Sequence, residues 1–249
     1  MSIPGTISLA WQLSARFPQA IARNSTLLCE KCRASHTNGR RSRAARGMRF
    51  ALHGGMATNN RPVVCEIPVF FASSEGQTRR IAWRLASVLH DLGFESCAID
   101  LAGPTATDID WTQVRGALVG ASLHAGKHQK AAKDFVQKHA ADLNRVPSAF
   151  FSVSLSAASK NPKEVEAAES LAKAFPVASG WTPERVASVA GRLAYLEYGF
   201  FIRLVMKRIA KKEGAPTDTS RDYELTKWEV VDQLARDMAR RIRARAAVA

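Results

Sequence analysis

From residue 63 onward, apolar positions follow two different periods. Short, nearly continuous apolar runs alternate with segments in which apolar residues recur every three or four positions. The runs predict buried strands at 63–71, 94–101, 116–121, 148–155 and 186–191. The spaced segments predict helices at 77–92, 128–143, 162–175 and 225–244.

This alternation predicts an α/β fold. Strands that are apolar on both faces are typical of a parallel sheet covered by helices on each side. Right-handed crossovers then give a five-stranded, doubly wound sheet. Such sheets bind ligands beyond the carboxyl ends of their strands, so the candidate site lies in the loops that follow residues 71, 121 and 153.

Charge divides the chain into two parts. The net charge is +14, and residues 1–61 hold ten Lys or Arg residues but one acid, Glu30. Gly, Arg, Ala and Asn are frequent at 39–61, which favours disorder. We therefore predict a basic, disordered extension at 1–61 and a single folded domain at 62–249, and we do not expect nucleic-acid binding.

Neither metal chemistry nor membrane spanning is indicated. Cys29 and Cys32 form a C-x-x-C pair with His36 nearby, but a second ligand pair for zinc is missing. No apolar run has the roughly 18 residues that a spanning helix needs. Residues 1–20 lack the pattern of a secretory signal. We expect a cytoplasmic protein without a metal ion.

The loop Ser73–Thr78 has the composition of a phosphate-binding turn. It follows a predicted strand and opens a predicted helix, so backbone N–H groups and the helix dipole favour an anion there. Gly76 allows close approach of a ligand to the backbone. An ordinary helix cap formed by Ser74 or Thr78 would explain the same residues. The loop has neither the Lys of a P-loop nor the glycines of a dinucleotide-binding fingerprint.

Two further loops lie at the same predicted edge. Residues 121–128 carry small side chains, then His124 and His128 on either side of Gly126, which would suit a flat aromatic cofactor. A metal site at the two histidines lacks accompanying carboxylates or cysteines, and His128 is better placed at the start of the next helix. Residues 152–159 are small and polar and could bind the edge of a ring, or simply be solvated.

These loops, together with other segments, resemble one enzyme family. The segments are 70–78, 119–122, 135–139, 147–153, 189–191 with Leu193 and Tyr195, 206–207, 217–219 and 226–229, which keep their order across about residues 63–243. They resemble the menaquinone-dependent protoporphyrinogen IX dehydrogenases. The resemblance implies a flavodoxin-like fold that binds flavin mononucleotide (FMN), oxidises protoporphyrinogen IX to protoporphyrin IX in haem biosynthesis, and reduces a membrane quinone, menaquinone or ubiquinone.

The resemblance also implies site residues. The phosphate would be held by Ser73, Ser74, Gly76, Gln77 and Thr78. The ring and ribityl chain would contact Ser122, Leu123, His124, Gly126, Ser152, Val153, Ser154 and Leu155. His124 is the candidate catalytic residue. The family has an arginine and an aromatic residue at positions 124 and 125, and Glu75 should point away from a phosphate because like charges repel.

A helical insertion is predicted at about 192–223, before the last helix. Within it, an apolar face and a basic remainder predict an amphipathic helix with three alternative roles: core packing, a cover over the flavin, or peripheral contact with the inner face of the cell membrane. The apolar face is formed by Tyr198, Phe201, Ile202, Val205 and Ile209, and the basic remainder by Arg203, Lys207, Arg208, Lys211 and Lys212.

Lys127, Arg192 and Arg203 could attract the substrate's propionates. The rival functions are an electron-carrier flavodoxin and a flavodoxin-like NAD(P)H-quinone reductase.

Overall fold

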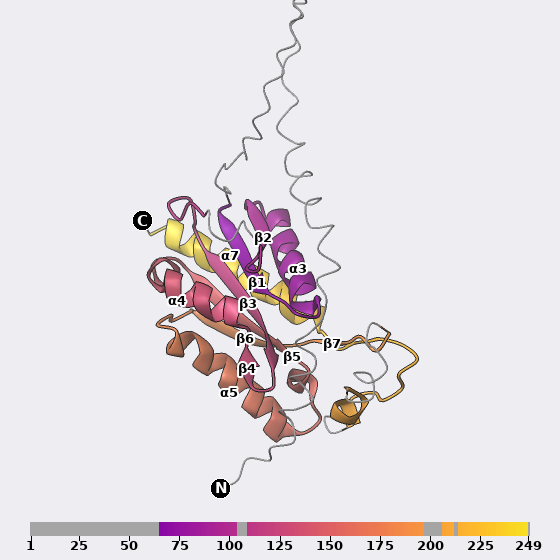
Figure 1. Cartoon of the computed structure of the whole chain (residues 1–249). Helices are drawn as coiled ribbons and strands as arrows, with labels where there is room; N and C mark the ends of the chain where they lie inside the picture. The colour runs from indigo at the N-terminus through magenta and orange to yellow at the C-terminus, as the bar shows by residue number, and fades with distance from the viewer. Residues whose placement is uncertain (1–64, 104–108, 197–205, 212–213, 249) are drawn as a thin grey trace, which may run out of the picture. The chain divides into compact units, whose positions relative to one another are not determined.

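The computed structural model describes residues 65–103, 109–196, 206–211 and 214–248 (Figure 1). The predicted extension at 1–61, the C-x-x-C pair and the boundary at residue 62 lie outside these ranges. The elements are β1 (Ile67–Ala72), α3 (Gln77–Asp91), β2 (Ser96–Asp100), β3 (Ala117–His124), β4 (Lys127–His128), α4 (Lys130–Arg145), β5 (Ser148–Ser154), a 3-10 turn (Ser156–Ala158), α5 (Pro162–Ala178), β6 (Arg185–Ala190), β7 (Arg192–Leu193), β8 (Tyr223–Glu224) and α7 (Trp228–Ala246).

The central sheet confirms the predicted architecture. Five parallel strands lie in the order β2-β1-β3-β5-β6, and β4 adds to the end of β3 in the antiparallel direction. The first described strand, β1, therefore lies next to the edge strand β2, and the chain then returns past β1 to add β3, β5 and β6 in turn. The strand order changes direction between β1 and β3, which is where doubly wound sheets place their ligands.

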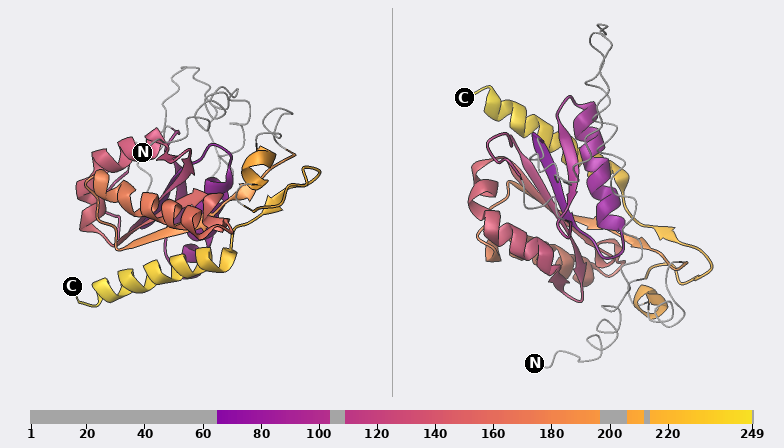
Figure 2. Two further views of the ribbon diagram at one scale, coloured as in Figure 1. Left: turned by 90° about the horizontal axis from the view of Figure 1, so that it is seen from below. Right: turned by 45° about the horizontal axis from the view of Figure 1, so that its top comes forward.

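Helices cover both faces of this sheet (Figure 2). On one face, α3 and α7 pack on an apolar cluster that includes Leu85, Phe151 and Met238. On the other face, α4 and α5 enclose a second cluster around Phe150 and Trp181. Both faces of the strands are therefore buried, which explains why their sequences are apolar without alternation.

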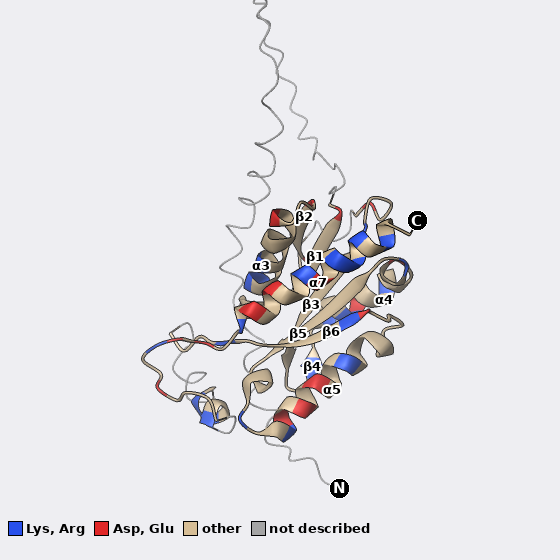
Figure 3. Cartoon of the chain, turned by 180° about the vertical axis from the view of Figure 1, so that it is seen from behind, with Lys and Arg blue, Asp and Glu red and all other residues tan. Residues whose placement is uncertain are grey.

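Local signals account for the helix ends. Gly93 adopts a left-handed φ of 87° directly after α3, as a terminating glycine does. Pro162 opens α5, and the Asn161 side chain accepts a hydrogen bond from the Lys163 N–H at 3.1 Å. In α7 the acids lie toward the start and the arginines toward the end (Figure 3), which suits the helix dipole.

The loop after β3 differs from the prediction. β3 continues to His124, and Ala125 and Gly126 then take positive φ values of 48° and 75°, which form a tight hairpin turn. His128 consequently lies in β4, where it pairs with Leu123 of β3, and α4 begins at Lys130. The prediction that His128 opens the helix was wrong, because the chain reverses before the helix can start.

The insertion has a small apolar cluster of its own. β7 pairs antiparallel with β8, and residues 206–211 are helical. Of the predicted apolar and basic positions, Tyr198, Phe201, Ile202, Arg203, Val205 and Lys212 lie outside the described residues. The cluster is formed by Leu193, Ala194, Tyr195, Met206 and Ala210, with Leu155 and Ile209 against it.

This cluster bears on the role of the insertion helix. Met206 and Ala210 are buried, whereas Lys207, Arg208 and Lys211 are exposed. In its described part, the helix thus turns Met206 and Ala210 toward this cluster, and all three alternatives for its role remain predictions. Among the helices within the described ranges, none is long and apolar enough to cross a membrane.

Candidate functional site

Three central strands end at one edge of the sheet. β1, β3 and β5 are parallel neighbours that finish at Ala72, His124 and Ser154. Their following loops are the three that the sequence singled out. The structure therefore gathers the predicted loops at the carboxyl edge, where β3 and its hairpin lie between the other two.

The first loop presents an open helix N-terminus. Gly76 precedes α3 with a left-handed φ of 83°, and no side chain caps the helix. Ser73 Oγ accepts the Gly76 N–H at 3.0 Å, which folds the loop back on itself. The first N–H groups of α3 have no partner within the helix, so the turn is suited to bind an anion.

Two buried hydroxyls near this edge have no partner within the described part of the chain. Thr78 Oγ1, in the first turn of α3, and Ser122 Oγ, near the end of β3, make no hydrogen bond among the described residues. A buried hydroxyl without a partner is unfavourable, and a ligand with anionic or carbonyl oxygens would relieve it. An uncapped helix start beside the Thr78 hydroxyl fits a phosphate, and the Ser122 hydroxyl could bind another polar group of a ligand.

The first two loops are joined through Ser74. Its Oγ lies 3.3 Å from His124 Nε2 and accepts a hydrogen bond from the Gln129 side chain. Burial lowers the pKa of His124, and the charge of Glu75 acts weakly in the opposite direction. The His124 ring is therefore neutral at pH 7, and its Nε2 lies beside the candidate phosphate turn.

His128 joins the second and third loops instead. Its Nε2 lies 2.9 Å from Ser152 Oγ, and its ring packs against Phe150 and Phe175. Burial lowers the pKa of His128 to about 4. These contacts are those of a structural histidine that holds the hairpin against β5. Within the described ranges, no group of three His, Cys, Asp or Glu side chains could hold a metal ion.

The third loop uses its hydroxyls internally. Ser154 Oγ accepts the Ala157 N–H at 3.2 Å, while the Ser152 hydroxyl is engaged by His128. Val153 is buried in the core, and Leu155 packs against the insertion cluster. Contacts from Ser152–Leu155 to a cofactor remain a prediction, and they would fall to backbone groups more readily than to these hydroxyls.

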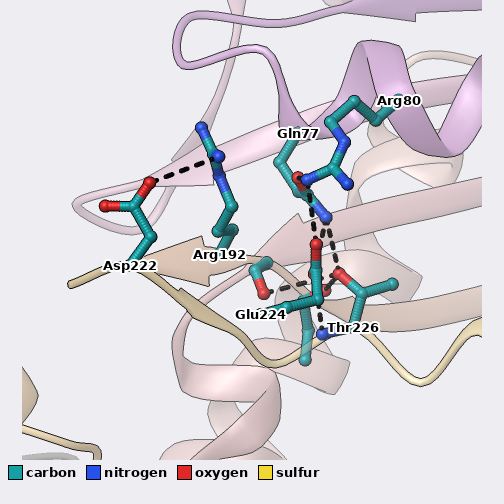
Figure 4. Close-up of polar contacts among 8 residues, drawn as sticks. Gln77, Arg80, Arg192, Asp222, Glu224 and Thr226 are labelled. Atoms are coloured by element: carbon teal, nitrogen blue, oxygen red, sulfur yellow. Dashed lines mark hydrogen bonds and ion pairs between the residues drawn. The ribbon is translucent and has the colours of Figure 1, made fainter. Parts of the chain in front are cut away.

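The Gln77 side chain is also committed to partners in the protein (Figure 4). Its Nε2 donates to Glu224 Oε1 and to Thr226 Oγ1, both at 2.8 Å, and its Oε1 accepts from Arg80 at 3.0 Å. A role for Gln77 in binding phosphate would therefore belong to its backbone N–H. Arg80, Glu224 and Thr226 are not among the predicted site residues. Glu224 and Thr226 lie 147 and 149 positions from Gln77 along the chain, so no local pattern relates them to it.

The basic candidates occupy different environments. Lys127 is exposed in the β3–β4 hairpin, whereas Arg192 lies 3.5 Å from Asp222 across the insertion (Figure 4). Arg203 lies outside the described residues. Of the two described candidates, Lys127 is the exposed one, and it lies in the hairpin of the candidate site.

A surface hollow lies on another part of α3. It has a volume of about 500 Å³ and is lined by Arg80, Trp83, Arg84 and Trp228. Both arginines there are engaged in ion pairs, Arg80 with Glu224 and Arg84 with Asp232. The unpaired hydroxyls and the open helix start are located elsewhere, so we place the site at the loops and not in this hollow.

The sheet order and the open turn after the first strand define a flavodoxin-type domain. A family model described as a flavodoxin domain matches residues 68–220. The chain is 37% identical over 171 residues to "Protoporphyrinogen IX dehydrogenase [quinone]" of Escherichia coli (strain K12), spanning 69% of this chain and 93% of that protein. The chain therefore belongs to the flavodoxin-like protoporphyrinogen IX dehydrogenase family.

Two other similarities were found. A protein of the same name from Leishmania major is 32% identical over 173 residues, which is 69% of this chain and 73% of that protein. Among solved structures, a flavodoxin from Streptococcus pneumonia TIGR4 has 17% identity and a TM-score of 0.42, over 72% of this chain and 98% of that one.

Proposed function

We propose that this protein oxidises protoporphyrinogen IX to protoporphyrin IX in an FMN-dependent reaction, with a quinone as the electron acceptor, in haem biosynthesis. The relatives that carry this activity in their names are 37% and 32% identical to the chain. The structural observation that carries the proposal is the uncapped start of α3 with an unpaired, buried Thr78 hydroxyl beside it.

The cofactor would be FMN, with its terminal phosphate on this turn. A phosphate monoester is close to dianionic at neutral pH and would accept hydrogen bonds from the first N–H groups of α3 and from Ser73, Ser74 and Thr78. Gly76 would let the phosphate approach the backbone, because no atom lies within 4 Å of where a Cβ would stand. Leu123, His124 and Gly126 in the hairpin would border the ring.

A bound flavin supplies two-electron redox chemistry, while the protein binds and orients the reactants. Protoporphyrinogen loses six electrons and six protons overall, so three quinones are reduced for each porphyrin formed. The neutral His124 ring, 3.3 Å from Ser74 Oγ at Nε2, is our candidate to accept one of these protons. Lys127 would attract the propionates.

Access to a membrane quinone is also a proposal. Lys207, Arg208 and Lys211 form an exposed basic face on the insertion helix, which would attract an anionic lipid surface. We propose a cytoplasmic protein that associates peripherally with the inner face of the cell membrane. Flotation with anionic vesicles, compared with neutral ones, would measure this association directly.

The test of the function uses the purified full-length protein. Denaturation should release FMN, identified by its mass. Anaerobic mixing with protoporphyrinogen IX and either a menaquinone or a ubiquinone analogue should then yield protoporphyrin fluorescence together with quinol. Bound FMN without porphyrin formation would indicate an electron carrier. Quinone reduction by NAD(P)H without porphyrin oxidation would indicate a quinone reductase. Either result would overturn the proposal.

A further inference from the structure

One buried amide ties the start of α3 to the far end of the insertion. Gln77 is the first residue of α3 and only 6% exposed. Both of its amide hydrogens are used, one toward Glu224 Oε1 and one toward Thr226 Oγ1. Its carbonyl oxygen accepts from Arg80, which also donates to Glu224 Oε2 at 2.9 Å. Figure 4 shows the four side chains converging on this point.

Thr226 and Glu224 extend this connection into the insertion. The Thr226 hydroxyl donates to the Ala190 carbonyl at 2.7 Å, so it joins α3 to the end of β6. Glu224 belongs to β8, which is paired with β7 next to the apolar cluster of the insertion. That cluster includes Leu155 from the loop after β5. A continuous set of contacts therefore runs from the candidate phosphate turn to the insertion and back to the site.

We propose that Gln77 is a positioning residue that couples occupancy of the phosphate turn to the placement of the insertion. This inference rests on the function proposed above. Its backbone N–H is among the groups that would bind the phosphate, and its side chain holds Glu224 and Thr226. A phosphate that holds residue 77 in place at the turn also holds the paired strands β7 and β8 in place. Because thermodynamic coupling is reciprocal, an ordered insertion in turn strengthens cofactor binding.

Arg80 balances the negative charge of Glu224 in this connection. Glu224 is an acid near the start of α3, where it would repel a phosphate if it were unpaired. Arg80 donates to both Gln77 and Glu224, and its guanidinium lies over the Trp228 ring, 5.7 Å from the ring centre, so its positive charge offsets that of the carboxylate. The bridge thus lets an acidic residue anchor the insertion without opposing an anion.

The key variant is Thr226→Val, which keeps the shape of the side chain but removes the hydroxyl that joins Gln77 to Ala190. The matched control is Asp232→Asn, which weakens the Arg84–Asp232 pair between α3 and α7, two helices that lie outside the insertion in the sequence. Thr226→Ser keeps the hydroxyl and should therefore keep the hydrogen bonds to Gln77 and Ala190. Should Thr226→Val fail to fold, Glu224→Gln removes the charge pair with Arg80 while it keeps the size of the side chain.

Two measurements need no enzyme activity. FMN affinity is measured by quenching of flavin fluorescence, and trypsin cleavage at the exposed Lys207, Arg208 and Lys211 is followed with and without saturating FMN. In the wild-type protein, FMN should slow cleavage about fivefold or more, a typical size for coupled sites. Thr226→Val should bind FMN about tenfold more weakly and lose most of this protection. Asp232→Asn and Thr226→Ser should stay within about twofold of wild type.

Steady-state kinetics separates positioning from general damage. Thr226→Val, saturated with FMN, should raise KM for protoporphyrinogen with kcat nearly unchanged. Equal trypsin cleavage with and without FMN in the wild type, or wild-type FMN affinity and protection in Thr226→Val, would overturn the coupling. If FMN protects the insertion and Thr226→Val abolishes this, but no porphyrin forms, the proposed function fails while the coupling stands.

Discussion

Two buried serines on neighbouring strands show how differently the two ends of the sheet are finished. Ser148 starts β5, and its Oγ accepts the Trp181 indole N–H at 2.9 Å. Ser122 lies near the end of β3, and its Oγ has no partner among the described residues. Both are at most 7% exposed. In this pair, the serine at the amino end of β5 is hydrogen-bonded and the serine near the carboxyl end of β3 is not, although Ser152 and Ser154 at the same edge do have partners.

A buried polar group without a hydrogen-bond partner therefore needs a second structural feature beside it before it indicates a ligand. Within the described ranges, Trp111 Nε1 and Ser188 Oγ are also buried without a partner, yet they lie outside the three loops. Thr78 differs, because an uncapped helix start with a left-handed Gly76 adjoins it. The unpaired hydroxyl and the open N–H groups point to the same ligand chemistry, an anion.

The largest effect is expected at the amino end of the sheet. Trp181 is fully buried, so Trp181→Ala should lower the free energy of unfolding by about 3–5 kcal/mol. Trp181→Phe keeps the bulk but leaves Ser148 unpaired, and should lower it by about 1–3 kcal/mol. Urea unfolding without FMN measures both changes. FMN affinity of the folded variants should stay unchanged, and a parallel loss of affinity would contradict the division between the two ends.

The next effect is expected at the carboxyl end of the sheet, where FMN binding should change and stability should not. Thr78→Val removes a hydroxyl that has no partner in the described ranges, so the free energy of unfolding of the FMN-free protein should stay within about 0.5 kcal/mol of wild type or rise. FMN binding should weaken by about 1.5–3 kcal/mol, roughly tenfold to a hundredfold, because a hydrogen bond to a charged phosphate is lost. Titration by flavin fluorescence gives the affinity.

Thr78→Ser is the matched control for that change, because it keeps the hydroxyl and loses only a methyl group. It should bind FMN more tightly than Thr78→Val does. Wild-type FMN affinity in Thr78→Val would show that the hydroxyl does not reach the phosphate, and would remove the main argument for placing the ligand on this turn.

Much of the fold and the location of the site could be predicted from local sequence. The helix at 77–92 was predicted within a residue of α3, because its apolar spacing and Gly93 lie within one short window. Apolar strands separated by helices were sufficient for the doubly wound sheet. The carboxyl-edge rule then selected the loops where Thr78 and Ser122 are found.

What could not be predicted depends on non-local pairing or unusual backbone. Ala125 adopts a positive φ, which is uncommon for alanine, so the hairpin that places His128 in β4 has no clear signal in the sequence. The Gln77–Thr226 contact joins residues 149 positions apart. No spacing rule along the chain relates them, and Gln77 was therefore assigned to phosphate binding without its partners.

The smallest effect concerns His128, which belongs with the hydrogen-bonded groups although it lies at the carboxyl end. Its pKa is lowered from 6.5 to about 4 because burial disfavours the charged ring. The unfolded chain therefore binds a proton more readily than the folded one. The contribution to stability is complete above pH 6.5, falls as the pH drops toward 4, and is constant below that. Allowing for the partial exposure of the ring, this contribution to the free energy of unfolding should fall by about 1–2 kcal/mol between pH 7 and pH 5.

His128→Phe is the variant that isolates this contribution. Phenylalanine can keep the contacts with Phe150 and Phe175, but it leaves Ser152 Oγ without its partner, so stability at pH 7 should fall. The slope of unfolding free energy against pH between 7 and 5 should nevertheless become flatter. It should not vanish, because burial also lowers the pKa values of His124 and His139. Urea unfolding at each pH measures this slope, and the wild-type slope in the variant would show that His128 already titrates as it does in the unfolded chain.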